Sequence, residues 1–279
     1  MRPTYAGNMA RRRFVRTMAL RHHDGASTRQ PVQVVVEEPM EIRLDGHPVS
    51  TTMRTPGHDF ELAVGFCHGE GLLGGAAVQS VRYCGTGSAV QTGFNVVSVA
   101  TGGWAPEPAT ESATEQNSNG CGLSGSGAVE SLSERLDPLV ATPFDIALLE
   151  RIEQRAERER TLLAETDGSD SAAVFGVRDG RVLVVREDID LGNAVDKVVG
   201  RLLLDGRLPA LIAGGEPLGL WVSGRLGFEL ARRAWAGGFV VLAAGGAASS
   251  LALEVAERAN LTLVSFARGA TATVYPAAR

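Results

Sequence analysis

The stretch LGLWVSGRLGFELARRAWAGGFVVLAAGGAASSLALEVAERANLTLVSF, residues 218–266, decides the fold. Short apolar runs at 218–222, 239–243 and 261–266 have the length and composition of buried strands. Between these runs, residues 228–236 and 249–260 repeat apolar side chains every three or four positions, which is the spacing of an amphipathic helix. Strands that alternate with helices predict an α/β sheet covered by helices.

The same alternation extends upstream and defines a C-terminal α/β domain over residues 128–279. A helix resumes near residue 128, and Thr142-Pro143 is a typical start for a long charged helix that we expect to reach residue 165. The turn Arg178-Asp179-Gly180 then separates two strands. The remaining expected elements are strands at 172–177, 181–186 and 272–275 and a helix at 193–204.

Residues 31–100 predict a smaller, strand-rich α+β domain. Asp45-Gly46 between two β-rich segments is a hairpin signal, and a helix is expected from Asp59, after Pro56-Gly57. Residues 1–30 hold seven arginines and one acidic residue, and we expect them to form a mobile basic arm. Residues 101–127 are rich in Gly, Ser, Thr, Pro and Asn, which predicts a mobile loop between the domains.

Composition excludes several classes of protein. Hydrophobic residues make up 44% of the 279 residues and charged residues 21%, as in a globular chain with a sizeable core. A net charge of −5 argues against a general nucleic-acid binder. No apolar run is long enough to span a membrane, and no apolar segment follows Arg11-Arg12-Arg13 as an export signal requires. We therefore expect a cytoplasmic protein that binds neither nucleic acid nor membrane.

The three cysteines are too few for a disulfide framework or a four-cysteine zinc site, so no metal site is expected. Cys67 lies on an apolar helix face, which indicates core packing, and Cys84 ends a strand. Cys121 lies between two glycines in the 101–127 loop, where a thiol is a chemical liability unless it is used. An accidental exposed thiol is the competing interpretation.

A second candidate site lies beyond the carboxyl ends of the C-terminal strands, where ligands bind in open α/β sheets. The segments there bring together basic and polar side chains among many glycines. Such a set could cradle phosphate groups, or its Arg–Asp pairs could simply tie loops together. These residues are Arg186, Asp188, Asn193, Arg225 and Arg268.

Other catalytic motifs fail their structural context. Residues 120–125 match G-x-G-x-x-G by letters but follow Asn117-Ser118-Asn119 rather than a strand, so a dinucleotide site is not expected. The five histidines do not form a catalytic triad with a nucleophile, and neither a zinc-deaminase signature nor a Walker loop occurs.

Several segments together resemble the FdhD/NarQ family of formate dehydrogenase accessory sulfurtransferases. The similarity covers residues 31–276. The segments that carry it are EEPMEIRLDG at 37–46, MRTPGHDFELAVGF at 53–66, VVRED at 184–188, NAVDK at 193–197, VSGR at 222–225, FEL at 228–230 and FARG at 266–269.

The resemblance implies a fold and a function. The implied C-terminal fold is a cytidine-deaminase-like three-layer α/β/α domain without zinc. Family members accept sulfur from a cysteine desulfurase as a loop-cysteine persulfide and pass it to the molybdenum of bis-molybdopterin guanine dinucleotide, which then enters formate dehydrogenase. Cys121 matches the family's loop cysteine, and homodimers are usual. The implied cofactor-binding residues are Phe266, Ala267, Arg268, Gly269, Ala270 and Thr271, to which we add Arg225, Arg186 and Asn193.

The chain departs from the family pattern at a few positions. Ser124 stands where the loop motif has its second cysteine, Asp190-Leu191-Gly192 replaces a Gly-Arg-His segment, and Asp170 replaces a histidine. Two alternatives therefore stand beside the sulfur carrier: a cofactor-binding chaperone that transfers no sulfur, and a degenerate paralogue that binds only a partner.

Overall fold

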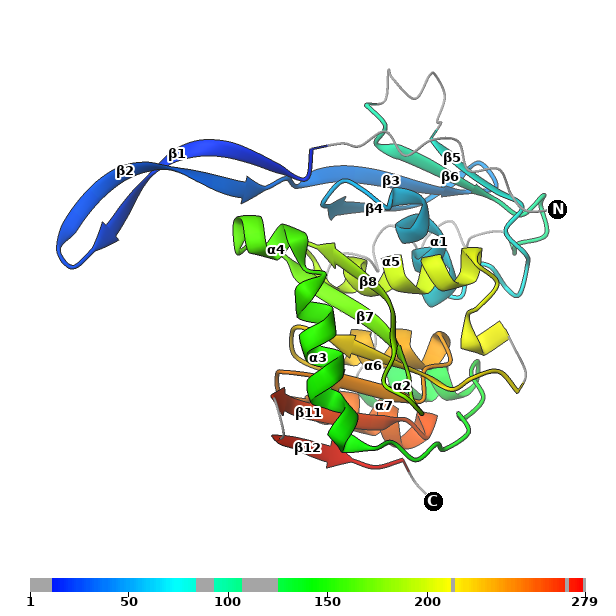
Figure 1. Cartoon of the computed structure of the whole chain (residues 1–279). Helices are drawn as coiled ribbons and strands as arrows, with labels where there is room; N and C mark the ends of the chain where they lie inside the picture. Colours follow the sequence, from blue (N-terminus) through cyan, green and yellow to red (C-terminus); the bar gives the residue numbers. More distant parts are fainter. Residues whose placement is uncertain (1–11, 84–92, 107–124, 212–213, 269–270, 278–279) are drawn as a thin grey trace.

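The computed structural model describes residues 12–83, 93–106, 125–211, 214–268 and 271–277. Within these residues the strands form three sheets of two, four and six strands (Figure 1). No helix of this described part is long and apolar enough to cross a membrane.

The six-stranded sheet organises the C-terminal half in the order β12-β11-β10-β9-β7-β8. Strands β9, β10 and β11 are parallel, and β7 and β12 run antiparallel to their neighbours. The strands are β7 (Asp170–Gly176), β8 (Val182–Asp188), β9 (Leu218–Val222), β10 (Val241–Ala244), β11 (Thr262–Arg268) and β12 (Thr271–Tyr275).

Helices cover both faces of this sheet. One face packs against α2 (Gly125–Ser133), α5 (Leu191–Leu204), α6 (Phe228–Ala236) and α7 (Ser250–Ala259). The other face packs against α3 (Leu149–Arg158), through Leu149, Ile152 and Ala156. The expected three-layer α/β/α fold is confirmed, together with the smaller strand-rich unit described next.

The smaller unit is the four-stranded sheet β4-β3-β6-β5, with helix α1 (Asp59–Gly69) on one face. Its turn follows the sequence prediction, because Asp45 and Gly46 both have positive φ, as a two-residue hairpin of type I′ requires. The strands are β3 (Glu38–Leu44), β4 (His47–Arg54), β5 (Ser80–Tyr83) and β6 (Val96–Ala100).

The N-terminal segment differs from the sequence expectation. We expected a mobile arm through residue 30, but β1 (Phe14–His23) and β2 (Ala26–Val35) form an antiparallel hairpin that projects from the body (Figure 1). Asp24 and Gly25 turn the chain with positive φ, which repeats the chemistry of the Asp45-Gly46 turn.

The long helix expected through residue 165 is also broken in the structure. A 3-10 turn, Ile146–Leu148, leads into α3, and a separate short helix α4 (Thr161–Thr166) follows. Arg160 sits at the break with a non-helical backbone, and α4 packs beneath the base of the hairpin, where Gln33 Nε2 donates to Glu165 Oε2 at 2.6 Å. The break thus redirects the chain toward β2.

Two glycines bring α1 and α5 into contact and so join the two larger sheets. A Cβ on Gly65 would overlap the carbonyl oxygen of Asp196, and a Cβ on Gly200 would overlap that of Glu61. Only glycine therefore permits this crossing, in which helix backbones touch directly.

Candidate functional site

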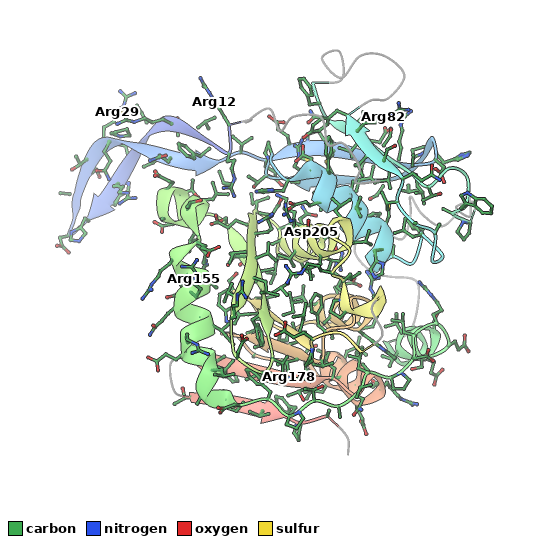
Figure 2. The ribbon with its side chains drawn as sticks, turned by 45° about the vertical axis from the view of Figure 1, so that its right-hand side comes forward. Arg12, Arg29, Arg82, Arg155, Arg178 and Asp205 are labelled. Atoms are coloured by element: carbon green, nitrogen blue, oxygen red, sulfur yellow. The ribbon has the colours of Figure 1, made fainter. Side chains whose placement is uncertain are left out.

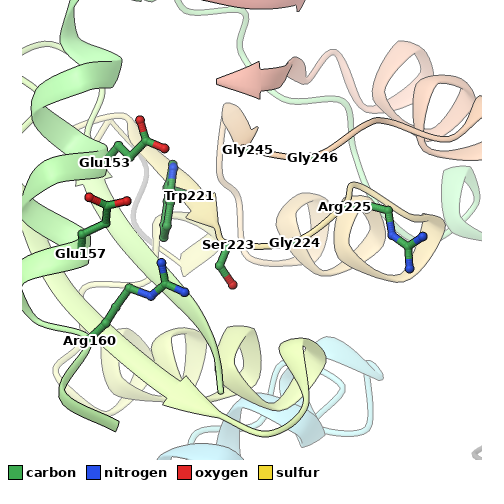
Figure 3. Close-up of a pocket in the computed structure, with 9 residues that line it drawn as sticks. All are labelled: Glu153, Glu157, Arg160, Trp221, Ser223, Gly224, Arg225, Gly245 and Gly246. Atoms are coloured by element: carbon green, nitrogen blue, oxygen red, sulfur yellow. The ribbon is translucent and has the colours of Figure 1, made fainter. Parts of the chain in front are cut away.

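The candidate site is a pocket of about 320 Å³ at the carboxyl ends of the parallel strands β9 and β10. Figure 3 shows strand-end residues on one side of the pocket and side chains from the α3–α4 region on the other. This is the edge where open α/β sheets bind ligands. The lining residues are Glu153, Glu157, Arg160, Trp221, Ser223, Gly224, Arg225, Gly245 and Gly246.

Glycines let the two strand-end loops approach one another closely. Gly246 N donates to the carbonyl of Gly224 at 3.1 Å, and a Cβ on Gly246 would lie 2.5 Å from that oxygen. Ser223 continues the polar floor, since its hydroxyl donates to Asp170 Oδ1 at 2.7 Å and accepts from the backbone N–H of Ser171 at 3.0 Å. The floor is therefore backbone and small polar groups.

Two polar atoms in the pocket wall have no hydrogen-bond partner within the part of the chain that the structure describes. Trp221 is 2% exposed, and its indole Nε1 is buried without a hydrogen bond. The Nε atom of Arg160 is likewise buried without a hydrogen bond. A buried donor left unsatisfied costs roughly 1–3 kcal/mol. Both residues line the pocket, so a ligand or water with an acceptor in this region would recover part of that cost.

Of the residues that the sequence singled out, Arg225 lines the pocket, whereas Phe266 is joined to the lining residue Gly246 through its backbone. Arg225 is exposed, and no carboxylate among the described residues pairs with its guanidinium. Phe266 is half exposed, adopts a positive φ of 52°, and donates its N–H to the carbonyl of Gly246 at 3.0 Å. A positive φ is strained for an aromatic residue, and such strain is common in residues held for binding.

The rest of the expected cofactor segment is only partly described. Ala267 is buried in the core, so its side chain does not reach the pocket. Arg268 ends β11 and pairs through its backbone with Thr271, which begins β12. Gly269 and Ala270 lie outside the described residues.

Arg186 and Asn193 do not join Arg225 in one cradle. Arg186 reaches α1 instead, where Nε lies 2.5 Å and Nη2 2.8 Å from the two carboxylate oxygens of Glu61. Asn193 donates to the carbonyl of Met53 at 2.8 Å. Neither residue lines the pocket. Their partners come from the four-stranded unit, and the prediction of a cradle considered only the C-terminal strands.

Instead, these side chains belong to a buried charged cluster that fastens the two units. Lys197 and Asp188 are at most 1% exposed and lie 2.6 Å apart, and Lys197 Nζ also donates to the carbonyls of Thr55 and Glu187. Burial lowers the pKa of Lys197, although Asp188 opposes the shift. Arg186 and Asp188 thus tie segments together, which is the alternative that the sequence left open, but their partners are Glu61 and Lys197 and not one another.

The Arg186–Glu61 pair stabilises the ionised form of Glu61. Burial alone would raise the pKa of Glu61, but hydrogen bonds from Arg186 and His58 outweigh it and lower the pKa to about 2. Glu61 is therefore ionised at neutral pH and holds Arg186 on α1.

The described residues restrict which thiol can be reactive. Cys67 is fully buried on α1, and desolvation raises the pKa of its thiol far above the usual range. Its expected place in the core is confirmed. Cys84, Cys121 and Ser124 lie outside the described residues.

Some pocket residues were missed from sequence. The sequence suggests a solvated helix face for Glu153, Glu157 and Arg160, and a core position for Trp221. These residues meet only because α3 packs across the strand ends. In the described part of the chain, no group of three His, Cys, Asp or Glu residues is placed to hold a metal ion.

The chain is similar to known proteins in both sequence and fold. The model of the FdhD/NarQ family matches residues 35–279. The chain is 40% identical to the sulfur carrier protein FdhD of Streptomyces avermitilis, over 93% of each chain, and 40% identical to that of Mycobacterium tuberculosis, over 88% of this chain and 90% of the relative. A crystal structure from Desulfotalea psychrophila, described as a formate dehydrogenase accessory protein, superposes with a TM-score of 0.73 at 22% identity, covering 95% of this chain and 97% of the other.

Proposed function

Since this chain belongs to the FdhD/NarQ family, we propose that it is a cytoplasmic sulfur carrier for formate dehydrogenase. In this proposal a cysteine desulfurase supplies the sulfur, Cys121 carries it as a persulfide, and bis-molybdopterin guanine dinucleotide receives it at molybdenum. The observation that carries the proposal is the 40% identity to sulfur carrier proteins over almost the whole chain.

The choice of Cys121 rests on its match to the family's loop cysteine and on local sequence. Cys67 is unsuitable because a buried thiol with a raised pKa supplies no thiolate. Cys121 matches the family's loop cysteine and has glycine on both sides, which gives the backbone the freedom to visit a donor and an acceptor in turn.

The loading step is balanced without any oxidant. The Cys121 thiolate attacks the terminal sulfur of the donor's cysteine persulfide, forming a new S–S bond as the donor's S–S bond breaks. The donor cysteine leaves as a thiolate, and the terminal sulfur keeps its proton. Ser124, which has no thiol, takes no part in this exchange, so a single cysteine carries the sulfur.

We assign the cofactor's nucleotide portion to the pocket at the ends of β9 and β10. Arg225 supplies a cation that suits a diphosphate, and the glycine loops allow close backbone approach. The unpartnered donors of Trp221 and Arg160 favour a ligand that presents acceptor atoms.

Mass spectrometry of the purified chain tests the sulfur step. After incubation with a cysteine desulfurase and cysteine, the peptide that contains Cys121 should gain about 32 Da, the mass of one sulfur atom added to the thiolate. Cys121→Ala should not load, whereas Cys67→Ala should load normally. A wild-type chain that gains no sulfur on this peptide, under conditions that load a known carrier, would refute the proposal and leave the non-transferring chaperone.

A further inference from the structure

Several apolar side chains of the β1–β2 hairpin are exposed in the part of the chain that the structure describes. None of residues 12–35 is buried, although the hairpin spans ten residues in each strand. Two-stranded hairpins that stand alone are at best marginally stable in water, and their free edges are available to other chains. The hairpin therefore has the form of an element completed by a partner.

Its exposed apolar residues are concentrated to an unusual degree. Ten large hydrophobic side chains are exposed in the described part of the chain, and half of them lie on this hairpin. Leu20 is 63% exposed and Met18 50% exposed, near the outer end. Because side chains alternate between the two faces of a strand, Phe14, Met18 and Leu20 share one face of the hairpin, and the paired residues Val15 and Val34 share the other. The five are Phe14, Val15, Met18, Leu20 and Val34.

The hairpin is also positively charged, whereas the rest of the protein is acidic. Residues 12–35 contain five arginines and a single acidic residue, Asp24, in a chain whose net charge is −5. Arg21 and Arg29 lie on the outer half, and Figure 2 shows Arg29 on the projecting part of the ribbon. Arginine with methionine and aromatic residues is the composition enriched at protein–protein interfaces. The matching partner surface is acidic, with an apolar centre.

The base of the hairpin adjoins the wall of the candidate pocket. Gln33 bonds Glu165 of α4, and Arg13 lies 3.6 Å from Glu187, whose carboxylate accepts the N–H groups of the first turn of α4. Arg160, immediately before α4, lines the pocket. The base of the hairpin is therefore linked through α4 to a residue of the pocket wall.

We propose that the β1–β2 hairpin is the docking element for the apoprotein that receives the cofactor, through an acidic, apolar-centred face of that protein. The identity of this partner rests on the proposed function and is the formate dehydrogenase polypeptide without its cofactor. The adjacency of hairpin and pocket favours the cofactor's recipient over the sulfur donor, because the recipient must take the pocket's contents.

Two other occupants must be distinguished from the apoprotein. Nucleic acid would pair with the arginines but gains little from the aliphatic side chains of Met18, Leu20 and Val34. A second copy of the chain also presents an acidic body, so self-association through the hairpin is an outcome that the test must distinguish.

Binding measurements on the full chain test the proposal. The probe is purified, cofactor-free formate dehydrogenase from the same organism, immobilised for biolayer interferometry. Met18→Ser/Leu20→Ser and, separately, Arg21→Glu/Arg29→Glu should each weaken its Kd at least tenfold. The matched control is Val140→Ser/Arg178→Glu, at exposed positions far from the hairpin in sequence, which should change Kd less than twofold. Circular dichroism confirms that each variant folds.

Parallel arms distinguish the alternatives. The same variants are tested against the cysteine desulfurase, against a DNA duplex, and for self-association by sedimentation. An unchanged Kd for the apoprotein overturns the proposal, whichever other arm responds. Sulfur loading of Cys121 is measured on the same samples and should be normal. Loading without hairpin-dependent binding refutes the docking proposal alone, and binding without loading refutes the proposed sulfur transfer alone.

Discussion

Replacing Lys197 by methionine should destabilise the protein by about 3 kcal/mol at pH 7, because it leaves Asp188 buried without its cation. Removing one partner of a buried pair typically costs about 3–5 kcal/mol. The lower end applies here, because the Asp188 carboxylate keeps hydrogen bonds from the N–H of Thr55 at 3.2 Å and from Asn193 Nδ2 at 3.2 Å. The methionine side chain fills most of the lysine volume, so a cavity adds little.

The measurement is urea unfolding followed by tryptophan fluorescence and circular dichroism at pH 7 and pH 5. A buried carboxylate without a cation takes up a proton on folding, so the deficit of Lys197→Met should shrink as the pH falls. Asp188→Asn/Lys197→Met should be more stable than Lys197→Met alone, because it removes the uncompensated charge. A deficit below about 1 kcal/mol at pH 7, or a double variant as unstable as the two single changes combined, would contradict this reasoning.

Three further predictions concern helix packing, acid stability and ligand binding. Gly200→Ala should destabilise the protein by about 1–3 kcal/mol, because its Cβ would overlap the Glu61 carbonyl oxygen and force α1 and α5 apart. As a control in the same urea assay, Gly227→Ala has open space at its Cβ and should cost less than about 1 kcal/mol. The pKa of Glu61 is lowered to about 2, so the stability that its carboxylate contributes is complete above about pH 4.5 and is lost as the pH falls toward 2. Glu61→Gln should remove about 3 kcal/mol of this acid dependence. An unchanged acid-unfolding curve would contradict the prediction. Arg225→Ala should weaken calorimetric binding of guanosine diphosphate about tenfold, the loss of one charge-assisted bond, with Arg178→Ala as a control that leaves binding unchanged.

The parts of the fold that could be predicted are those fixed by neighbours in sequence. β9 and α6 begin and end at the predicted residues, and α7 follows the expectation closely because Ser249 caps its start and Asn260 ends it in the left-handed conformation. The Asp45-Gly46 turn is equally local. The hairpin at residues 14–35 has the same Asp-Gly turn signal. Its many arginines and its exposed apolar residues, which build no core, instead favoured the prediction of a mobile arm.

The site was predictable where it depends on strand ends and unpredictable where it depends on packing between units. Arg225 follows β9 directly, and the sheet places it at the pocket. Arg186 lies near the carboxyl end of β8, yet its guanidinium binds Glu61 of α1. No periodicity within the C-terminal half could reveal that partner. Trp221 and Arg160 meet for the same reason, through the packing of α3 across the sheet.

The end of β8 explains how the hairpin, the pocket wall and the two larger units keep fixed positions. Successive residues of a strand point to opposite faces, so Asp188 binds Lys197 on one face while Glu187 turns to the other. There, the Glu187 carboxylate accepts the backbone N–H groups of Leu162 and Leu163 and lies near Arg13. One face thus fastens the four-stranded unit, and the other fixes α4 and the hairpin base. Under the proposed function, a protein docked on the hairpin would therefore be held in a fixed orientation to the pocket.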